Sequence, residues 1–458
     1  MSTVTDSHPR PNDEGRTVHL DTAVPLPEIY YQTTGPLHWV KDAEDAWISV
    51  TENSARMRIK NQGFSSFPAK RGENSEVERC LVGIQDRQNV AYAGSLAGLG
   101  SGVRVIHGRR VLVTDAPTFV NPCPDADWPN LRAIIDGMLN LPNHDQRPYL
   151  FGWLKVALEA YRARRWQPGQ VLALAGPIGS CKSLMQSVIT ELFGGRAAKP
   201  YLYMTGRTTF NADLFGAEHL VVEDEAESTD IRARRHFGSN IKDVAVNRVH
   251  QCHAKNRQAL TLTPMWRMTI SLNDEPARML VLPPLDEDVA DKVMLFKVQN
   301  PAMPMPTETA EDKERFWQTL IGELPGFVSF LNDYIIPQEL RSSRFGILHF
   351  HHPELVEALA ELTPETMLLR LIDWALRGTW DAGQNWEGPA TELMELLYTG
   401  NDWRHCEAKK LLRSTASCGI YLARLAADRR LGGRVTSNKV HGVTIWTVHR
   451  PMGPELAT

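Results

Sequence analysis

The sequence of 458 residues contains no apolar run of about 18 residues, so we expect neither a membrane-spanning helix nor a membrane partner. It also lacks a charged segment followed by an apolar one near its start, which predicts a cytoplasmic protein without a secretion signal. None of the six cysteines forms a CxxC pair, which argues against a disulfide framework and a structural zinc site. Neither charge sign dominates, because 50 Lys and Arg stand against 54 Asp and Glu. Affinity for a polyanion would therefore have to come from local patches.

The composition is that of a globular protein, with 42% apolar and 23% charged residues. At roughly 150 residues per domain, the length predicts about three domains. Patterning along the chain predicts six regions: a disordered tail (1–28), a small β-rich or α+β domain (29–128), a helical connector (129–165), a domain alternating strands and helices (166–335), a helical segment (336–386), and three helices followed by a strand pair (387–452).

The strongest motif is a glycine-containing loop between a predicted strand at 171–175 and a predicted helix at 184–193. It reads Gly176-Pro177-Ile178-Gly179-Ser180-Cys181-Lys182-Ser183 and resembles a Walker A loop. In such a loop backbone N–H groups and a helix N-terminus face phosphates, Lys reaches the β and γ phosphates, and Ser holds Mg²⁺. We therefore expect ATP and Mg²⁺ as cofactors, bound by residues 176–183. Cys181 stands where the pattern has Gly, and its side chain would crowd the nucleotide. An ordinary strand-to-helix turn is the alternative.

A second apolar run, Leu220 to Val222, ends in three consecutive acids. Nucleotide hydrolysis needs an acid at the end of a neighbouring strand to hold Mg²⁺ and to orient the attacking water. We assign Asp224 to the metal and Glu225 to the water, with Glu223 as the competing choice. An apolar run that ends in acids is also common at protein surfaces.

A third run, Met268 to Leu272, ends in Asn273, whose amide could hydrogen-bond the γ phosphate or the attacking water. A strand that ends in Asn-Asp can also be a simple turn. The gaps of about 40 and 50 residues between the loop, the acids and Asn273 favour the catalytic interpretation.

This order of motifs resembles superfamily 3 helicases, which are AAA+ motors, and most closely the helicase part of bacterial and phage primase-helicase proteins. Residues 206–211, 213–225 and 282–286 carry the resemblance, which extends over about 135–335. It implies an α/β fold with a RecA-like P-loop NTPase core and a homo-oligomeric ring, commonly hexameric. It also implies ATP-driven movement on DNA, as a helicase in the replication of phage, plasmid or other mobile-element DNA.

Between the acids and Asn273 lie six basic or titratable residues within sixteen positions, which could grip a phosphate backbone without reading sequence. They are Lys242, Arg248, His250, His253, Lys255 and Arg257. The resemblance implies a hairpin here whose basic tip tracks single-stranded DNA in a central channel, with Lys255 at the tip and His253 and Arg257 beside it. A solvated basic face is the alternative.

A ring ATPase also needs a cation from the neighbouring subunit to stabilise charge on the transferring phosphate. The resemblance implies an Arg just before the strand after Asn273, but Lys292 stands there. Lys292 supplies charge without the planar fork of Arg, and Arg278 is the second candidate.

The C-terminal region carries nine Lys and Arg between Arg404 and Lys439 against two acids, a net charge of +7. Three helices followed by a strand pair predict a winged helix, which would place Arg424, Arg429, Arg430 and Lys439 on DNA phosphates. A winged helix used for protein contact is the alternative.

The residues before the loop show no closely spaced metal-binding acids, so we do not expect priming activity, and a separate primase or polymerase would act with this chain. The role of residues 29–128 stays open between a ring collar, an origin-binding module and a docking surface. Cys181 and the missing Arg also support another function, an ATP-binding, weakly hydrolysing DNA-assembly scaffold or regulator in defence or a mobile element.

Overall fold

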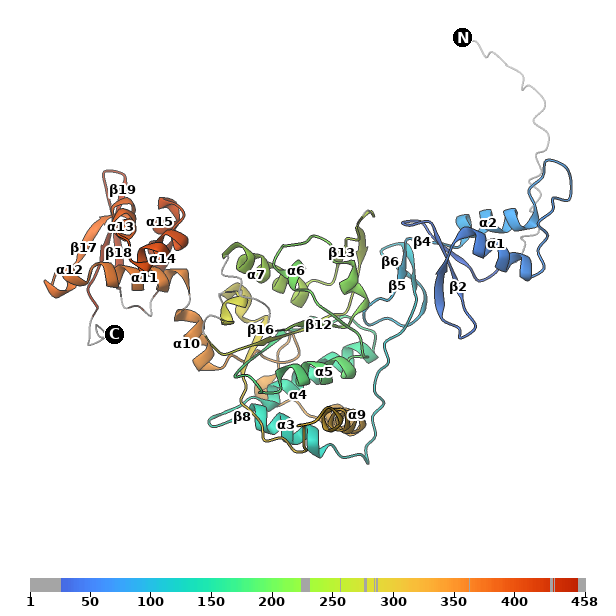
Figure 1. Ribbon diagram of the computed structural model, residues 1–458, viewed down its shortest axis with the longest axis horizontal. Helices are drawn as coiled ribbons and strands as arrows, with labels where there is room; N and C mark the ends of the chain where they lie inside the picture. The colour runs from blue at the N-terminus through green and yellow to red at the C-terminus, as the bar shows by residue number, and fades with distance from the viewer. Residues whose placement is uncertain are drawn as a thin grey trace, which may run out of the picture. The chain divides into compact units, whose positions relative to one another are not determined.

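The computed structural model describes residues 26–223, 231–255, 257–275, 278–283, 285, 287–361, 363–428, 431 and 433–451 (Figure 1). These residues form two compact units. The first comprises residues up to Gly94 together with 101–115, and the second comprises 95–100 and the chain from Ala116 onward. The first boundary therefore falls at 115 rather than at the expected 128. The expected tail, 1–28, lies outside the described residues up to position 25.

The first unit is α+β. One sheet has the order β3-β2-β1-β4 and the other β5-β7-β6. The strands are β1 (Tyr30–Gln32), β2 (Leu37–Lys41), β3 (Trp47–Val50), β4 (Asn89–Val90), β5 (Tyr92–Gly94), β6 (Gly102–Ile106) and β7 (Arg109–Val113). Helix α1 (Glu52–Asn61) begins after Thr51, whose side chain accepts the N–H of Ser54. Helix α2 (Glu76–Arg87) begins with a capping box between Ser75 and Glu78. Both starts follow from local cap chemistry that the sequence contains.

The second unit is built on a parallel five-stranded sheet with the order β11-β12-β15-β10-β16. The strands are β10 (Val171–Ala175), β11 (Ala197–Ala198), β12 (His219–Val222), β15 (Arg267–Leu272) and β16 (Val293–Lys297). Strands buried on both faces read as continuous apolar runs, which is why the sequence predicts β10, β12 and β15. Because all five are parallel, their carboxyl ends meet at one edge, and β15 lies between β10 and β12.

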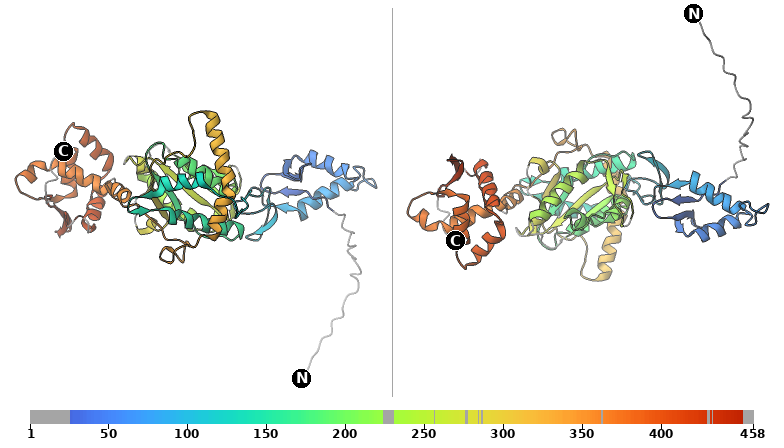
Figure 2. Two further views of the ribbon diagram at one scale, coloured as in Figure 1. Left: turned by 90° about the horizontal axis from the view of Figure 1, so that it is seen from below. Right: turned by 90° about the horizontal axis from the view of Figure 1, so that it is seen from above.

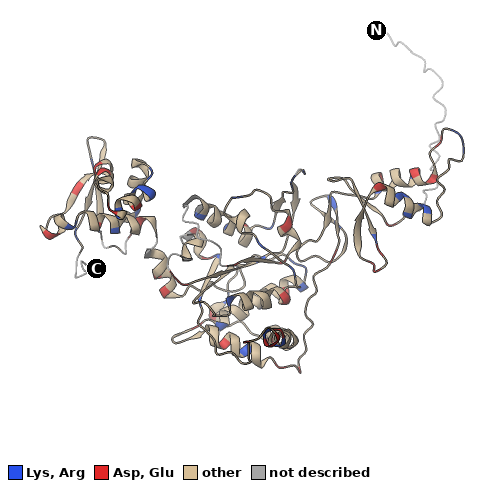
Figure 3. Cartoon of the chain, viewed as in Figure 1, with Lys and Arg blue, Asp and Glu red and all other residues tan. Residues whose placement is uncertain are grey.

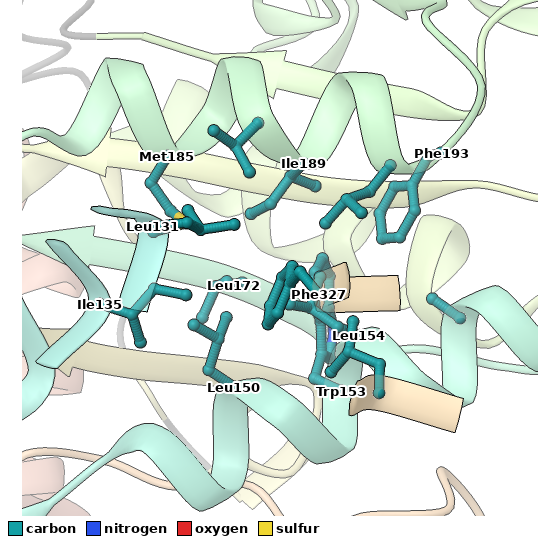
Figure 4. Packing of buried hydrophobic residues seen from close by; sticks show 14 of the residues in the cluster. Leu131, Ile135, Leu150, Trp153, Leu154, Leu172, Met185, Ile189, Phe193 and Phe327 are labelled. Atoms are coloured by element: carbon teal, nitrogen blue, oxygen red, sulfur yellow. The ribbon is translucent and has the colours of Figure 1, made fainter. Parts of the chain in front are cut away.

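Helices cover both faces of this sheet (Figure 1). One layer contains α3 (Pro129–Leu139), α4 (Arg147–Arg162), α5 (Lys182–Leu192) and α9 (Ala310–Asp333), and the other contains α6 (Tyr201–Met204) and α7 (Ile231–Val246). Figure 1 looks down α9, and Figure 2 shows this helix lengthwise. Figure 4 shows Leu131, Trp153, Leu172, Ile189 and Phe327 packed in one cluster of buried side chains. Residues 129–165 therefore belong to the core of this unit instead of only connecting to it.

Buried polar contacts hold residues 95–100 in the second unit. The carboxylate of Glu218 is fully buried, accepts the N–H of Gly98 at 2.7 Å and pairs with Arg196. Gly98 has a φ of +77°, and a Cβ at this position would lie 2.4 Å from Met265 Cε. Only glycine fits this backbone conformation and this space.

Smaller elements complete the central part of the chain. They are β8 (Asn140–Leu141), β9 (His144–Asp145), the 3₁₀ turns η1 (Ala212–Gly216), η2 (Arg278–Val281) and η3 (Gln338–Leu340), the hairpin strands β13 (His250–Cys252) and β14 (Leu260–Leu262), α8 (Glu287–Ala290) and α10 (Pro353–Glu361). Among the described residues, no helix combines the length and apolar character that crossing a membrane requires.

The C-terminal part has its own core, made by α11 (Pro364–Ala375), α12 (Arg377–Asp381), α13 (Ala390–Tyr398), α14 (Trp403–Leu411), α15 (Thr415–Ala427) and an antiparallel sheet β17-β19-β18. The strands are β17 (Trp386–Pro389), β18 (Val435–Val440) and β19 (Val443–Val448). The expected strand pair is present, and β17 is an addition. Helices α11 and α12 share buried contacts with α13 and α15, so this core starts near 364 instead of 387.

Candidate functional site

The glycine-containing loop joins β10 to α5 at the carboxyl edge of the sheet. A Cβ on Gly176 would lie 2.2 Å from the carbonyl oxygen of Val298, so the loop can pass β16 only as glycine. Gly179 has a φ of +86°, the left-handed region that glycine adopts at little cost. Gly176 is therefore required by close packing where the loop leaves β10, and Gly179 is favoured by backbone conformation within the loop.

Cys181 is the residue before the first turn of α5, and its φ is +57°. This conformation costs a non-glycine residue roughly 1–2 kcal/mol, which explains why the pattern usually has Gly here. The Cys181 thiol points to Met303, with 3.8 Å between the two sulfur atoms. Burial raises the pKa of the Cys181 thiol, while nearby Lys182 acts in the opposite direction. The neutral thiol is therefore favoured.

Lys182 is buried and curled back over the loop. Its ammonium Nζ donates to the carbonyl oxygens of Gly176 and Pro177, both at 2.8 Å, and lies 3.2 Å from Ser180 Oγ. These neutral acceptors can be exchanged for charged phosphate oxygens, which form stronger hydrogen bonds with an ammonium. Ser183 lies exposed in the same first turn of α5. A cation, the N-terminus of α5 and a hydroxyl thus lie together at one short loop.

Asn273 and the loop lie side by side although nearly 100 residues separate them in sequence. The N–H of Gly176 donates to the carbonyl oxygen of Leu272 at 3.2 Å, and Ala175 pairs with Leu272 in the sheet. Asn273 follows directly at the carboxyl end of β15. The strand order therefore places Asn273 next to the start of the glycine-containing loop.

The acids at the end of β12 are only partly described. Glu223 Oε2 lies 2.5 Å from Lys199 Nζ, so this carboxylate is engaged with an exposed cation. Asp224 and Glu225, the residues expected at the metal and the attacking water, lie outside the described residues. Their assignment stays a prediction. The pairing of Glu223 weakens its claim as the competing choice.

Lys292 lies at the opposite edge of the sheet from the loop, directly before β16. Its side chain is only 11% exposed and pairs with Asp291 at 2.6 Å. Asp291 also pairs at 2.8 Å with Arg344, whose side chain is 45% exposed. An accessible planar cation therefore lies beside Lys292, and sequence reasoning missed it because Arg344 is 52 positions away. Arg278 begins η2, and its side chain lies outside the described part of the chain.

The basic stretch forms an antiparallel hairpin of β13 and β14. His253, Lys255 and Arg257 are exposed on the connecting loop, and Arg248 is exposed just before β13. Lys242 lies on α7 instead, where it pairs with Asp288 at 2.9 Å. His250 is turned inward, and burial lowers the pKa of its imidazole. His253, Lys255 and Arg257 thus lie together on the loop between β13 and β14.

A neighbouring segment supports the hairpin loop. Asn211 is buried, and its side-chain oxygen accepts the N–H of His253 at 2.7 Å while its amide donates to the carbonyl of Gln251 at 3.0 Å. Phe210 is 44% exposed, with its ring 6.1 Å from that of His253. An exposed aromatic ring beside cations is the combination that stacks and grips single strands. In the sequence, Phe210-Asn211 did not by itself indicate a site that binds single strands.

The C-terminal basic patch is less uniform than its net charge indicates. Arg424 lies 2.6 Å from Glu365, and Arg434 lies 2.5 Å from Asp373. Lys439 is exposed on β18, whereas Arg429 and Arg430 lie outside the described residues. Thr415, Ala416, Gly419, Ile420 and Ala423 line one side of an apolar groove of about 470 Å³ on α15. Figure 3 shows Lys and Arg interspersed with Asp and Glu. Protein contact thus stays open as a role for this part.

No protein-family model matches the chain, and no curated protein sequence matches it. Among solved structures, the apo NrS-1 C-terminal region (305–718) aligns with a TM-score of 0.51 and 13% identity, over 93% of this chain and 96% of that one. The A-form apo structure of that region aligns with the same score and coverage at 12% identity. JCV helicase aligns with a TM-score of 0.29 and 15% identity, over 54% of this chain and 63% of that one, a likeness too distant to support an argument. The chain thus shares the mixed α/β fold of the NrS-1 region.

Proposed function

We propose that this protein is an ATP-dependent DNA helicase or translocase of the superfamily 3, AAA+ type. It would act as a homo-oligomeric, commonly hexameric ring in the replication of phage, plasmid or other mobile-element DNA. The observation that carries the proposal is the loop at the carboxyl edge of the sheet, where Lys182 covers the carbonyls of Gly176 and Pro177 beside Asn273. The fold shared with the NrS-1 region supports it.

The residues present fit a nucleoside triphosphate with Mg²⁺. Lys182 and the N–H groups at the start of α5 supply positive charge to phosphates, and Ser183 supplies a hydroxyl for the metal. Bound Mg²⁺ would neutralise phosphate charge during hydrolysis. Asp224 would hold the metal, Glu225 would orient the attacking water, and Asn273 would bond the γ phosphate or that water. A neighbouring subunit would supply a cation, for which exposed Arg344 is better suited than buried Lys292.

Single-stranded DNA would bind in a central channel at the β13–β14 hairpin. His253, Lys255 and Arg257 would contact phosphates, and Phe210 would stack on a base. Arg248 is close enough along the chain to join them, whereas Lys242 is occupied by Asp288. The C-terminal part would act as a winged helix, with Lys439 as its exposed cation. A separate primase or polymerase would supply primers.

The second candidate is an ATP-binding, weakly hydrolysing DNA-assembly scaffold or regulator. The left-handed conformation of Cys181 and the pairing of Lys292 with Asp291 favour it, because both depart from a fast ring ATPase. The two candidates differ in one measurable property, namely whether DNA stimulates ATP turnover.

The deciding experiment is steady-state ATP hydrolysis by the purified chain, with and without single-stranded DNA, across a salt series. Lys182→Ala removes the cation from the loop, and Lys313→Ala removes an exposed cation from α9 as the matched control. Hydrolysis that rises with DNA, falls with salt, disappears in Lys182→Ala and survives in Lys313→Ala supports the motor. ATP binding without turnover under all conditions rejects the motor and favours the scaffold.

A further inference from the structure

A closed ring of polar side chains lies buried between α5 and the sheet, directly beneath the phosphate loop. Gln186 Nε2 donates to Thr269 Oγ1 at 2.9 Å, Thr269 Oγ1 lies 2.9 Å from His219 Nε2, and His219 Nδ1 lies 2.7 Å from Thr190 Oγ1. Thr190 Oγ1 then donates to the backbone carbonyl of Gln186 at 3.0 Å. His219 and Thr269 are fully buried, and Gln186 is 2% exposed. Water therefore has no access to the bonds among these three side chains, whereas Thr190 is half-buried.

The position of every proton in this ring follows from the hydrogen bonds. Thr190 gives its hydroxyl proton to the carbonyl of Gln186, so its oxygen accepts from His219 Nδ1–H. His219 Nε2 is then an acceptor, and Thr269 must donate its hydroxyl proton to it. Thr269 keeps lone pairs free to accept from the amide of Gln186. The ring works only with neutral His219, and burial lowers the pKa of this imidazole to about 3.

Gln186 also reaches the strand that ends in the acids. Its Nε2 donates a second hydrogen bond, 3.1 Å long, to the carbonyl oxygen of Val222, the last residue of β12. Gln186 lies one helical turn after Lys182, on the same face of α5. Thr269 lies on β15, which ends at Asn273. One amide thus ties α5 to the last residue of β12 and to the middle of β15.

An amide side chain at buried position 186 costs free energy of folding. Its Oε1 is buried and has no hydrogen-bond partner within the described residues. A methionine of similar length would fill the same space without leaving a buried acceptor unpaired. Packing alone therefore does not explain an amide here. Its two directed bonds to Val222 and Thr269 do, because they set the distance between α5 and two strands.

We propose that Gln186 is a positioning residue for ATP hydrolysis. It holds the end of β12, where Glu223 follows Val222, at a set distance from Lys182 and Ser183 on α5. Thr269 is the lateral contact that keeps β15 in the same register. This inference rests on the proposed ATPase function and names the residue through which loop and acids are aligned.

The test compares variants of the full chain by ATPase kcat and KM, by affinity for a fluorescent ATP analogue and by thermal melting. Gln186→Met removes both donated bonds, Thr269→Val removes only the lateral one, and Gln318→Met changes an exposed glutamine on α9 as a control. We expect Gln186→Met to lower kcat at least tenfold, with KM and nucleotide affinity changed less than threefold. Thr269→Val should lower kcat less, and Gln318→Met should match the wild type.

Unchanged kcat in Gln186→Met overturns the inference. A parallel loss of kcat, nucleotide affinity and melting temperature also overturns it, because it indicates a purely structural role. If Gln186→Met does not fold, Gln186→Glu keeps the shape but accepts where the amide donates, and wild-type kcat in this variant rejects the positioning role. Failure of the proposed function is distinguishable, because a wild type without Lys182-dependent hydrolysis rejects both proposals, whereas normal wild-type turnover with an active Gln186→Met rejects only this one.

Discussion

Asn211 and His253 are joined by two hydrogen bonds that bridge 42 positions of sequence. The side-chain oxygen of Asn211 accepts the N–H of His253 at 2.7 Å, and the backbone N–H of Asn211 donates to the carbonyl of His253 at 3.1 Å. His253 is the first residue after β13. The conformation of the hairpin loop is therefore set partly by a residue outside the hairpin.

Asn211→Ala should loosen the hairpin loop and lower affinity for single-stranded DNA by roughly tenfold, since leaving buried polar groups without partners costs about 1–3 kcal/mol. Nucleotide affinity should not change. DNA affinity is measured by fluorescence anisotropy at fixed salt. Asn247→Ala is the control, because its exposed side-chain amide donates at 2.8 Å to nearby Asp243 on α7 and not to the hairpin loop. Equal DNA affinity in both variants would show that the hydrogen bonds between Asn211 and the hairpin loop do not affect DNA binding.

Lys255→Ala and Arg257→Ala should each make single-strand binding less sensitive to salt. The slope of log K against log salt should become shallower by about 0.7 for each phosphate that the variant no longer neutralises. Lys242→Ala should leave the slope unchanged, because Asp288 already pairs with that cation. The measurement is a DNA titration at four salt concentrations. A slope that falls in Lys242→Ala as much as in the loop variants would contradict the assignment of the loop.

Cys181→Gly should raise the free energy of unfolding by about 1 kcal/mol, since glycine removes the cost of the left-handed backbone at φ +57°. It should also increase ATP turnover if the side chain crowds the nucleotide. Cys181→Ala keeps a Cβ and hence the backbone cost, so it should resemble the wild type in stability. Chemical denaturation and ATPase assays on both variants check this. A Gly variant less stable than the Ala variant would refute the strain argument.

Arg344→Ala should abolish most hydrolysis while leaving nucleotide affinity intact, if Arg344 acts on the nucleotide of the adjacent subunit. Mixing this variant with wild type should reduce activity more steeply than the fraction of variant added. Lys292→Ala should instead lower thermal stability, because it removes one of the two cations that pair with Asp291. Normal turnover in Arg344→Ala would exclude it as the supplied cation.

Stability should fall as the pH drops below about 6.5. Burial lowers the pKa of His219 to about 3 in the folded protein, against an ordinary value of 6.5. The unfolded chain therefore binds a proton between these values that the folded chain does not bind, and this group removes about 1.4 kcal/mol of stability per pH unit in that window. Burial also lowers the pKa of His38, which acts with the same sign. Above pH 6.5 neither group contributes.

Denaturation midpoints at several pH values from 7.5 to 4.5 measure this dependence. His219→Gln has no titrating imidazole, so its stability should vary less steeply with pH than that of the wild type. Equal slopes in the two proteins would show that His219 is not buried in its neutral form.

Local patterns were enough to predict the elements around the candidate site. The apolar runs predicted β10 at 171–175 with the bounds that the structure has, and the run Leu220 to Val222 covers all of β12 except its first residue. The strand pair expected near the C-terminal end is present as β18 and β19, joined by a turn at Gly442, which has a φ of +83°. Such features depend on burial of short segments and on turn chemistry, and both are written in neighbouring residues.

Contacts between distant residues were out of reach for the same reasoning. Lys242 and Arg424 counted as free cations in the sequence, yet Asp288 and Glu365 pair with them in the structure. Residues 364–386 looked like a separate helical segment until their shared core with α13 and α15 was visible. Charge counts and periodicity depend on residue types and their spacing along the chain. They do not predict which distant residues are in contact.

The sequence by itself determined the glycine-containing loop between a strand and a helix, the buried strands and the cluster of cations on the hairpin, because each of these features depends on only a few neighbouring residues. Only the tertiary structure decided that β15 lies between β10 and β12, that Asn273 stands beside Gly176, and that Gln186 meets Val222. These relationships depend on strand order and on the packing of α5. Many weak contacts from the whole chain set that order together, so no local segment contains it.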